Sequence, residues 1–169
     1  MAPAARLREG MSARNAGSAE NDMSVGDDMQ FVIRDAAWST DATLLQHVRR
    51  IVFIDEQRVP EELEWDDDDP LSPHALGLDA SGNAIATGRL LADGHIGRIA
   101  VLREWRGRGV GAALFEHLMS AARRHGHDIV YLNAQTHASG FYARYGFTVS
   151  GAEFIEAGIA HVAMERKLT

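Results

Sequence analysis

The hydrophobic pattern changes from strand-like to helix-like spacing soon after residue 30. Residues 31–34 form a short β-rich run, and apolar residues then recur three or four positions apart until Pro60, which cannot continue a helix. These apolar residues are Leu44, Leu45, Val48, Ile51 and Val52. The pattern predicts a strand and then a helix, with Thr40 or Asp41 as its cap and another helical turn at 61–63.

A second amphipathic helix is predicted from Val110 to about His125, and Gly126 suits its C-terminal cap. Its apolar stripe consists of Val110, Ala113, Leu114, Leu118, Ala121 and Ala122. Strands are predicted on both sides of it, separated by polar or glycine-containing connections. They cover residues 75–79, 84–91, 95–102, 130–134, 147–150 and 161–166, with a short helix over 138–145.

The element order is therefore β-α-(α)-β-β-β-α-β-α-β-β. It predicts an α/β fold of the α+β kind, a mixed sheet with helices on its faces. Residues 29–169 are expected to form one domain. Residues 1–28 are rich in Ala, Ser, Gly, Asn and Asp without sustained periodicity, and we expect a disordered tail there.

Composition narrows the possible functions. The chain has 169 residues, 46% of them hydrophobic, which is enough for one good core. A net charge of −7 without a basic patch argues against nucleic acid as a partner and suits a cationic substrate. No apolar run approaches the roughly 18 residues of a membrane span. The absence of cysteine excludes disulfides and a cysteine nucleophile, and fits a cytoplasmic protein.

The most informative segment is the turn at residues 106–111, Arg-Gly-Arg-Gly-Val-Gly, between a predicted strand and a predicted helix. Glycines allow a tight turn and a close approach of the backbone to a ligand. The free N–H groups and the dipole at a helix N-terminus favour an anion, and two arginines add groups suited to phosphate. The segment predicts a site for a phosphorylated cofactor.

Several classes of phosphorylated cofactor bind to turns of this general kind, and each class has its own sequence pattern. In the dinucleotide fingerprint the third glycine would fall on Ala112, and the acidic residue that should close the next strand is represented only by Asp128, which precedes that strand. The P-loop needs a lysine, and none occurs before Lys167. A glycine-rich connection without a ligand is a further alternative. The pattern Arg-x-x-Gly-x-Gly is similar to the pyrophosphate loop of the acyl-CoA N-acetyltransferases of the GNAT superfamily.

Two further segments strengthen this resemblance. Residues 97–107 resemble the family's strand-to-loop motif, and Phe-Tyr-Ala-Arg-Tyr-Gly-Phe at 141–147 resembles its tyrosine motif. Residues 52–60, followed by Glu64, Asp66, Asp69 and His74, are similar to the ElaA-like and YjcF-like branch. The resemblance covers about residues 30–168. Gln135 departs from the family's usual Asn at that position.

The resemblance implies acetyl-CoA as co-substrate and assigns residues to it. Ile99, Ala100 and Val101 would lie beside the pantetheine arm, with a backbone N–H near Val101 as oxyanion donor. Gln135 would hydrogen-bond near the pantetheine. The pyrophosphate would lie against the loop of Arg106, Gly107, Arg108, Gly109, Val110 and Gly111. Tyr142 would lie near the sulfur, where a phenol with a pKa of about 10 can protonate a thiolate; the alternatives are that it only packs in an aromatic core or only orients the thioester.

The general base is not fixed by the sequence. Glu56, His74 and His161 are candidates, since a carboxylate or imidazole can take a proton from an amine. Glu56 can equally be a solvated acid at a helix end, and His74 a structural hydrogen-bonding residue. Arg98 can face a substrate carboxylate or pair with an acid. The acidic run at 64–69 lacks EF-hand spacing, and we expect a solvated loop, or a rim that attracts an amine, rather than a metal site.

These observations predict an N-acetyltransferase that moves acetyl from acetyl-CoA to a primary amine. Without a cysteine as acyl carrier, direct attack in a ternary complex is favoured. The alternatives are a non-catalytic acyl-CoA-binding module or sensor on the same fold, and a nucleotide-binding module. The expected partners are acetyl-CoA and an amine, with no nucleic acid and no membrane. The resemblance also implies a possible homodimer, formed through sheet edges or the last strands.

Overall fold

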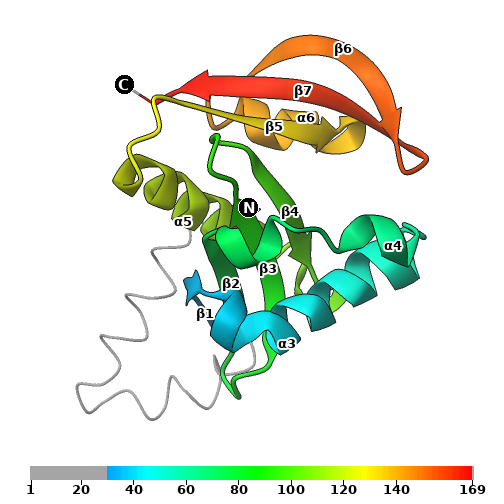
Figure 1. Cartoon of the computed structure of the whole chain (residues 1–169), viewed down its shortest axis with the longest axis vertical. Helices are drawn as coiled ribbons and strands as arrows, with labels where there is room; N and C mark the ends of the chain where they lie inside the picture. Colours follow the sequence, from blue (N-terminus) through cyan, green and yellow to red (C-terminus); the bar gives the residue numbers. More distant parts are fainter. Residues whose placement is uncertain (1–29, 169) are drawn as a thin grey trace.

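Two antiparallel sheets form the framework of the protein (Figure 1). The computed structural model describes residues 30–168, so the predicted tail lies outside the described residues. In the first sheet the strands follow chain order: β1 (Phe31–Ala36), β2 (His74–Asp79), β3 (Ala84–Leu90) and β4 (Ile96–Val101). The second sheet has the order β5 (Ile129–Gln135), β7 (Ile159–Lys167) and β6 (Thr148–Glu156).

Two long helices accompany the sheets. The first is α3 (Trp38–Arg49), which continues in the π-helical segment η2 (Arg50–Glu56), and the second is α5 (Val110–Arg124). The short elements are α4 (Glu61–Glu64), η3 (Asp69–Leu71), η4 (Arg103–Trp105), η5 (Thr136–Ala138) and α6 (Ser139–Ala143). None of the helices within residues 30–168 is long and apolar enough to cross a membrane.

The predicted order of elements is confirmed, and the differences lie at their ends. The prediction of Thr40 or Asp41 as N-cap of the first helix is wrong, because Ala37 holds that position. Asp41 instead lies in the first turn and accepts a hydrogen bond from the Ala37 N–H at 3.1 Å. The last two strands are longer than their hydrophobic runs, since much of β6 is exposed and polar.

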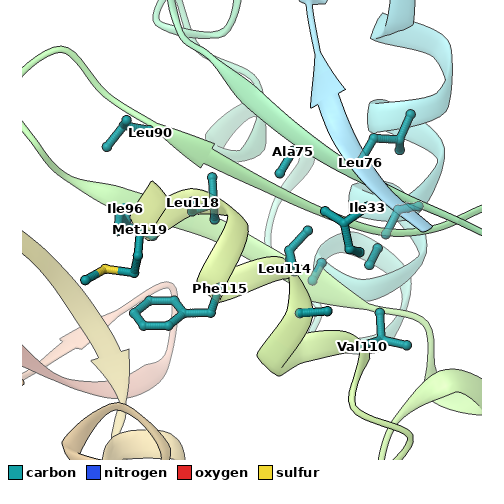
Figure 2. Close-up of a cluster of buried hydrophobic side chains, with 14 of the residues drawn as sticks. Ile33, Ala75, Leu76, Leu90, Ile96, Val110, Leu114, Phe115, Leu118 and Met119 are labelled. Carbon is teal, nitrogen blue, oxygen red and sulfur yellow. The ribbon is translucent and has the colours of Figure 1, made fainter. Parts of the chain in front are cut away.

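The helices α3 and α5 cover opposite faces of the first sheet. Two consecutive residues of β3, whose side chains must point to opposite faces, show this arrangement. A Cβ on Gly88 would lie 2.6 Å from Leu118 Cδ1 of α5. Arg89, the next residue, joins a cluster of charges with Arg49 of α3. Figure 2 shows Leu114 and Leu118 of α5 in the buried cluster that also contains residues of β1 and β2. The predicted apolar stripe of this helix is buried throughout.

Within the described residues, one isolated strand bridge pairs the two sheets. A parallel bridge joins His95 to Tyr131, where the Tyr131 N–H donates to the Gly94 carbonyl at 3.2 Å. Beyond it, no further pairing joins β4 to β5 within residues 30–168. The pairing of β4 with β3 is also irregular opposite Gly88, where Arg98 has a φ of 51°. A bulge of this kind bends a strand, and here β4 and β5 separate beyond the bridge.

Candidate functional site

A cleft of ≈ 500 Å³ opens where β4 and β5 separate. Its walls come from these two strands, the end of η2, the α4 turn, the η5–α6 segment and the β6–β7 hairpin. The lining residues are Phe53, Gln57, Val59, Leu63, Glu64, His95, Ile96, Gly97, Arg98, Ile99, Leu132, Asn133, Gln135, Ala138, Tyr142, Glu156, Ala157, Ile159 and His161. The cleft thus combines apolar walls with a few converging polar groups, as ligand sites commonly do.

The edge of β4 that faces the cleft keeps backbone groups available for a ligand. The Leu102 N–H donates to the Ile85 carbonyl of β3 at 2.9 Å. Because neighbouring residues of a strand direct their polar groups to opposite edges, those of Ile99 and Val101 point away from β3. The Val101 carbonyl accepts from Arg106 Nε at 2.9 Å. Ala100 is buried and pairs with Thr87, so its side chain does not line the cleft.

The glycine-rich loop forms the N-terminus of α5, as predicted from the sequence. Gly107 and Gly109 have φ values of 77° and 85°, in the left-handed region that glycine adopts without strain. Gly109 is the N-cap, and its carbonyl accepts the first bond of the helix from Ala113 at 3.0 Å. The amides of Val110 and Gly111 therefore have no intrahelical acceptor. This geometry suits an anion.

The two arginines of the loop already have protein partners. Arg106 Nη2 lies 2.5 Å from Glu56 Oε1, in addition to its bond to the Val101 carbonyl. The Arg108 guanidinium lies over the Trp105 ring, 5.1 Å from its centre. Arg106 therefore holds the loop against β4 and η2. Arg108 packs on the ring of Trp105 at the surface of the loop.

Glu56 does not line the cleft, although it was a candidate base. It forms ion pairs with Arg106 and, at 2.6 Å, with Arg103. Hydrogen bonding to Arg106, followed by Arg103, lowers the pKa of this carboxyl below its ordinary value. A paired carboxylate of lowered pKa is a weak base. Through these ion pairs, Glu56 connects the end of η2 to the loop before α5.

Tyr142 lines the cleft on α6 and packs in an aromatic cluster. Its ring centre lies 5.2 Å from that of Phe115 and 5.1 Å from that of Phe141. The hydroxyl has no hydrogen-bond partner within residues 30–168. Burial raises the pKa of Tyr142 to about 12, so the phenol is protonated at neutral pH. A protonated hydroxyl without a protein partner can donate to a ligand in the cleft.

Gln135 lies at the end of β5 and bridges the two walls of the cleft. Its Nε2 donates to Gln57 Oε1 at 3.1 Å, across from the end of η2. The π-helical turns of η2 end with the Gln57 N–H donating to the Val52 carbonyl at 3.1 Å. This wider turn directs Glu56 to the loop and Gln57 to the cleft.

His74, the other candidate base, lies outside the cleft and is almost completely buried at 3% exposure. Its Nε2 lies 2.9 Å from the Asp69 carbonyl, and its ring lies against Trp38 at 5.6 Å between centres. Burial lowers the pKa of His74, so the imidazole is neutral at neutral pH. Its position supports the structural interpretation.

The expectation that residues 64–69 form a solvated loop is wrong for two of the acids, Glu64 and Asp69. Glu64 and Asp69 are buried, at 3% and 1% exposure, and Asp66 is partly covered. They neutralise three arginines of the first half of the fold in one connected cluster. The ion pairs of this cluster are Arg49–Glu64 (2.7 Å), Arg49–Asp69 (2.7 Å), Arg89–Asp66 (2.7 Å), Arg89–Asp69 (2.8 Å), Arg98–Glu64 (3.2 Å) and Arg98–Asp66 (3.2 Å).

This cluster also decides between the two interpretations of Arg98. Its guanidinium pairs with acids of the chain and donates to the Glu64 carbonyl at 3.0 Å, while the residue lines the cleft. His161 lines the cleft as well, with Nδ1 2.7 Å from the Ile159 carbonyl. The sequence did not single out His95, Asn133 or Glu156, which also line the cleft. A buried arginine such as Arg49 on an apolar helix face was the available signal that nearby acids are buried too.

Comparison with known proteins agrees with this geometry. A family model described as an acetyltransferase (GNAT) domain matches residues 52–168. The N-acetyltransferase YjcF of Bacillus subtilis is 39% identical over 122 residues, which cover 70% of this chain and 86% of YjcF. The protein ElaA of Escherichia coli is 32% identical over 132 residues, covering 73% of this chain and 86% of ElaA.

Solved structures give the same result. An acyl-CoA N-acyltransferase from Pseudomonas aeruginosa superposes with a TM-score of 0.74 at 31% identity, covering 81% of this chain and 99% of the other. The structure of Escherichia coli ElaA also gives 0.74, at 29% identity, covering 82% and 100%. The chain therefore belongs to the GNAT family of acetyltransferases, which are acyl-CoA-dependent enzymes.

Proposed function

We propose that the protein transfers an acetyl group from acetyl-CoA to a primary amine by direct attack within the cleft between β4 and β5. Three features support the proposal: the β4 edge that points away from β3, the unpaired amides at the N-terminus of α5, and the unpartnered hydroxyl of Tyr142, which lines the cleft. Each suits a different part of acetyl-CoA. The amides of Val110 and Gly111 suit the pyrophosphate, and the β4 edge suits the pantetheine amides.

The thioester carbonyl would lie beside Val101. Its N–H points away from β3 and would stabilise the oxyanion that forms when the amine attacks. As the carbon–sulfur bond breaks, its electron pair moves to the sulfur. Tyr142 would donate its hydrogen bond to that sulfur, and the thiolate gains a proton.

The pKa of Tyr142 limits how this proton moves. A free thiol has a pKa of about 8.5, well below the value of about 12 for this phenol, so full transfer to a solvated thiolate is unfavourable. A thiolate in the same water-poor groove is a stronger base than in solution. Tyr142 therefore acts first as a hydrogen-bond donor to the departing sulfur, and the proton follows as charge develops.

Release of CoA should be measured with acetyl-CoA and a panel of polyamines, amino sugars, amino acids and peptide amines. We expect turnover with at least one amine. Tyr142→Phe should lower kcat by about a hundredfold, with a Kd for acetyl-CoA within about twofold of wild type. Tyr145→Phe is the matched control, because Tyr145 bonds to Glu116 at 3.2 Å and does not line the cleft.

Two outcomes would contradict the proposal. An unchanged kcat in Tyr142→Phe would remove the tyrosine from the reaction. Tight binding of acetyl-CoA without turnover of any amine would favour the alternative of an acyl-CoA-binding sensor.

A further inference from the structure

Among the residues that line the cleft, two carry carboxylates, Glu64 and Glu156. Glu156 is exposed at the end of β6, whereas Glu64 is buried at the end of α4. An amine approaches the enzyme as an ammonium ion at neutral pH, so a carboxylate in a low-dielectric part of the cleft is its natural counter-charge. Of the two carboxylates, Glu64 is therefore the better candidate to bind the ammonium group.

The hydrogen bonds of Glu64 leave one of its oxygens free. Arg49 Nε donates to Oε2 at 2.7 Å, and Arg98 Nε lies 3.2 Å from the same oxygen. Within residues 30–168 no donor hydrogen-bonds to Oε1. This oxygen is also not completely buried, unlike other unpartnered side-chain atoms such as His74 Nδ1. Oε1 is therefore the oxygen that the cleft can reach.

The position of Glu64 suits the acceptor rather than the cofactor. Arg98, its partner, directly precedes Ile99, where the β4 edge becomes available for the thioester arm. The phosphate-binding loop lies beyond the other end of that edge, after Val101. A group held at Glu64 would thus meet the thioester from the side opposite to the pyrophosphate.

The charges around Glu64 hold it in place without using its free oxygen. Arg49 and Arg98 are its direct partners, and each of them also pairs with a further acid. A third arginine and a histidine lie beside these acids. These additional groups are Asp66, Asp69, Arg89 and His74. With all acids ionised, three arginines face three carboxylates, so the cluster is neutral. Burial nevertheless raises the pKa of Glu64 above its ordinary value, as suits a general base.

We propose that Glu64 Oε1 binds the ammonium group of the acceptor in the cleft and takes its proton, which rests on the proposed function. One N–H bond of the ammonium breaks and an O–H bond forms on Glu64. The freed lone pair attacks the thioester carbon, the C–N bond forms and the C–S bond breaks with its electrons on sulfur. A second proton of the amine ends on the sulfur, and Glu64 returns its proton to solvent.

Glu64→Gln removes the charge and keeps the shape, and Glu62→Gln, an exposed change on the same short helix, is its matched control. With the amine that wild type turns over fastest, Glu64→Gln should lower kcat/KM by about 10²–10³-fold. It should also abolish the rise of kcat/KM with pH that deprotonation of Glu64 produces in wild type. The Kd for acetyl-CoA should not change, which separates this effect from general damage to the cleft.

A binding measurement makes the test independent of turnover. n-Butylamine at neutral pH, titrated into CoA-saturated protein, should bind wild type and Glu62→Gln alike and Glu64→Gln at least about tenfold more weakly. Equal binding in all three, or a pH profile that persists in Glu64→Gln, would overturn the proposal. If wild type acetylates no amine, the proposed function fails, and the titration still decides whether Glu64 holds an ammonium ion.

Glu64→Asp guards against a variant that does not fold. It keeps the charge opposite Arg49 but withdraws the free oxygen from the cleft by one methylene. We expect the pH dependence to remain, with a kcat/KM at least about tenfold below wild type and an unchanged Kd for acetyl-CoA. A wild-type kcat/KM in Glu64→Asp would contradict a direct contact with the acceptor.

Discussion

At the scale of single residues, paired buried charges shape this protein. Arg89 is 4% exposed and shares two acids with its neighbours, and such a guanidinium cannot be removed without leaving carboxylates in the interior. A surface pair costs far less to lose because water replaces the partner. Arg50 and Glu61 form such a pair, with about half of each side chain exposed.

Arg89→Leu should therefore lower the free energy of unfolding by about 3–5 kcal/mol, since the buried Asp69 and the more exposed Asp66 would lose a cation that they share. Arg50→Ala, the exposed control, should cost less than about 1 kcal/mol. Urea denaturation monitored by tryptophan fluorescence measures both. Similar small losses in the two variants would mean that the cluster is not energetically important.

At the scale of elements, the function depends on how α5 begins. Its N-cap is Gly109 at a φ of 85°, and its other end is followed by Gly126 at a φ of 80° with open space around it. Both glycines adopt a conformation that costs other residues roughly 1–2 kcal/mol. Only the first lies where a pyrophosphate is expected.

Gly109→Ala and Gly126→Ala should accordingly lower the melting temperature by similar amounts. Gly109→Ala alone should weaken acetyl-CoA binding, by about tenfold or more, because a distorted N-terminus misdirects the amides of Val110 and Gly111. Calorimetric titration with acetyl-CoA gives the two affinities. Equal affinities would argue that the pyrophosphate does not lie at this helix end.

The sequence predicted the order of elements well because each carried a local signal. The stripe of α5 and the glycine-rich turn depend on spacing and on residues that permit a particular backbone. The sequence could not predict which acids are buried. Four consecutive aspartates at 66–69 look solvated, and only the position of distant arginines such as Arg49 and Arg89 makes Asp69 an interior residue. The free oxygen of Glu64 likewise depends on contacts 15 or more positions apart in the chain.

At the scale of the whole molecule, the site exists because the two sheets join at one bridge and then separate. The bridge between His95 and Tyr131 anchors one end of the opening. Gln57 and Gln135 connect its walls further along. The bulge at Arg98 bends β4 so that its edge remains unpaired. Acetyl-CoA would lie in this opening like a strand between the two sheets, with the amine entering beside Glu64.

The central claim is direct transfer from acetyl-CoA to an amine within this opening. The most direct test mixes the enzyme with isotope-labelled acetyl-CoA and the best amine of the panel, quenches the reaction rapidly and follows the label by mass spectrometry. Direct transfer predicts that the label appears on the amine at the rate of CoA release and at no time on the protein. Label bound covalently to the protein before the product appears, or acetyl-CoA that stays bound and intact with every amine, would contradict it.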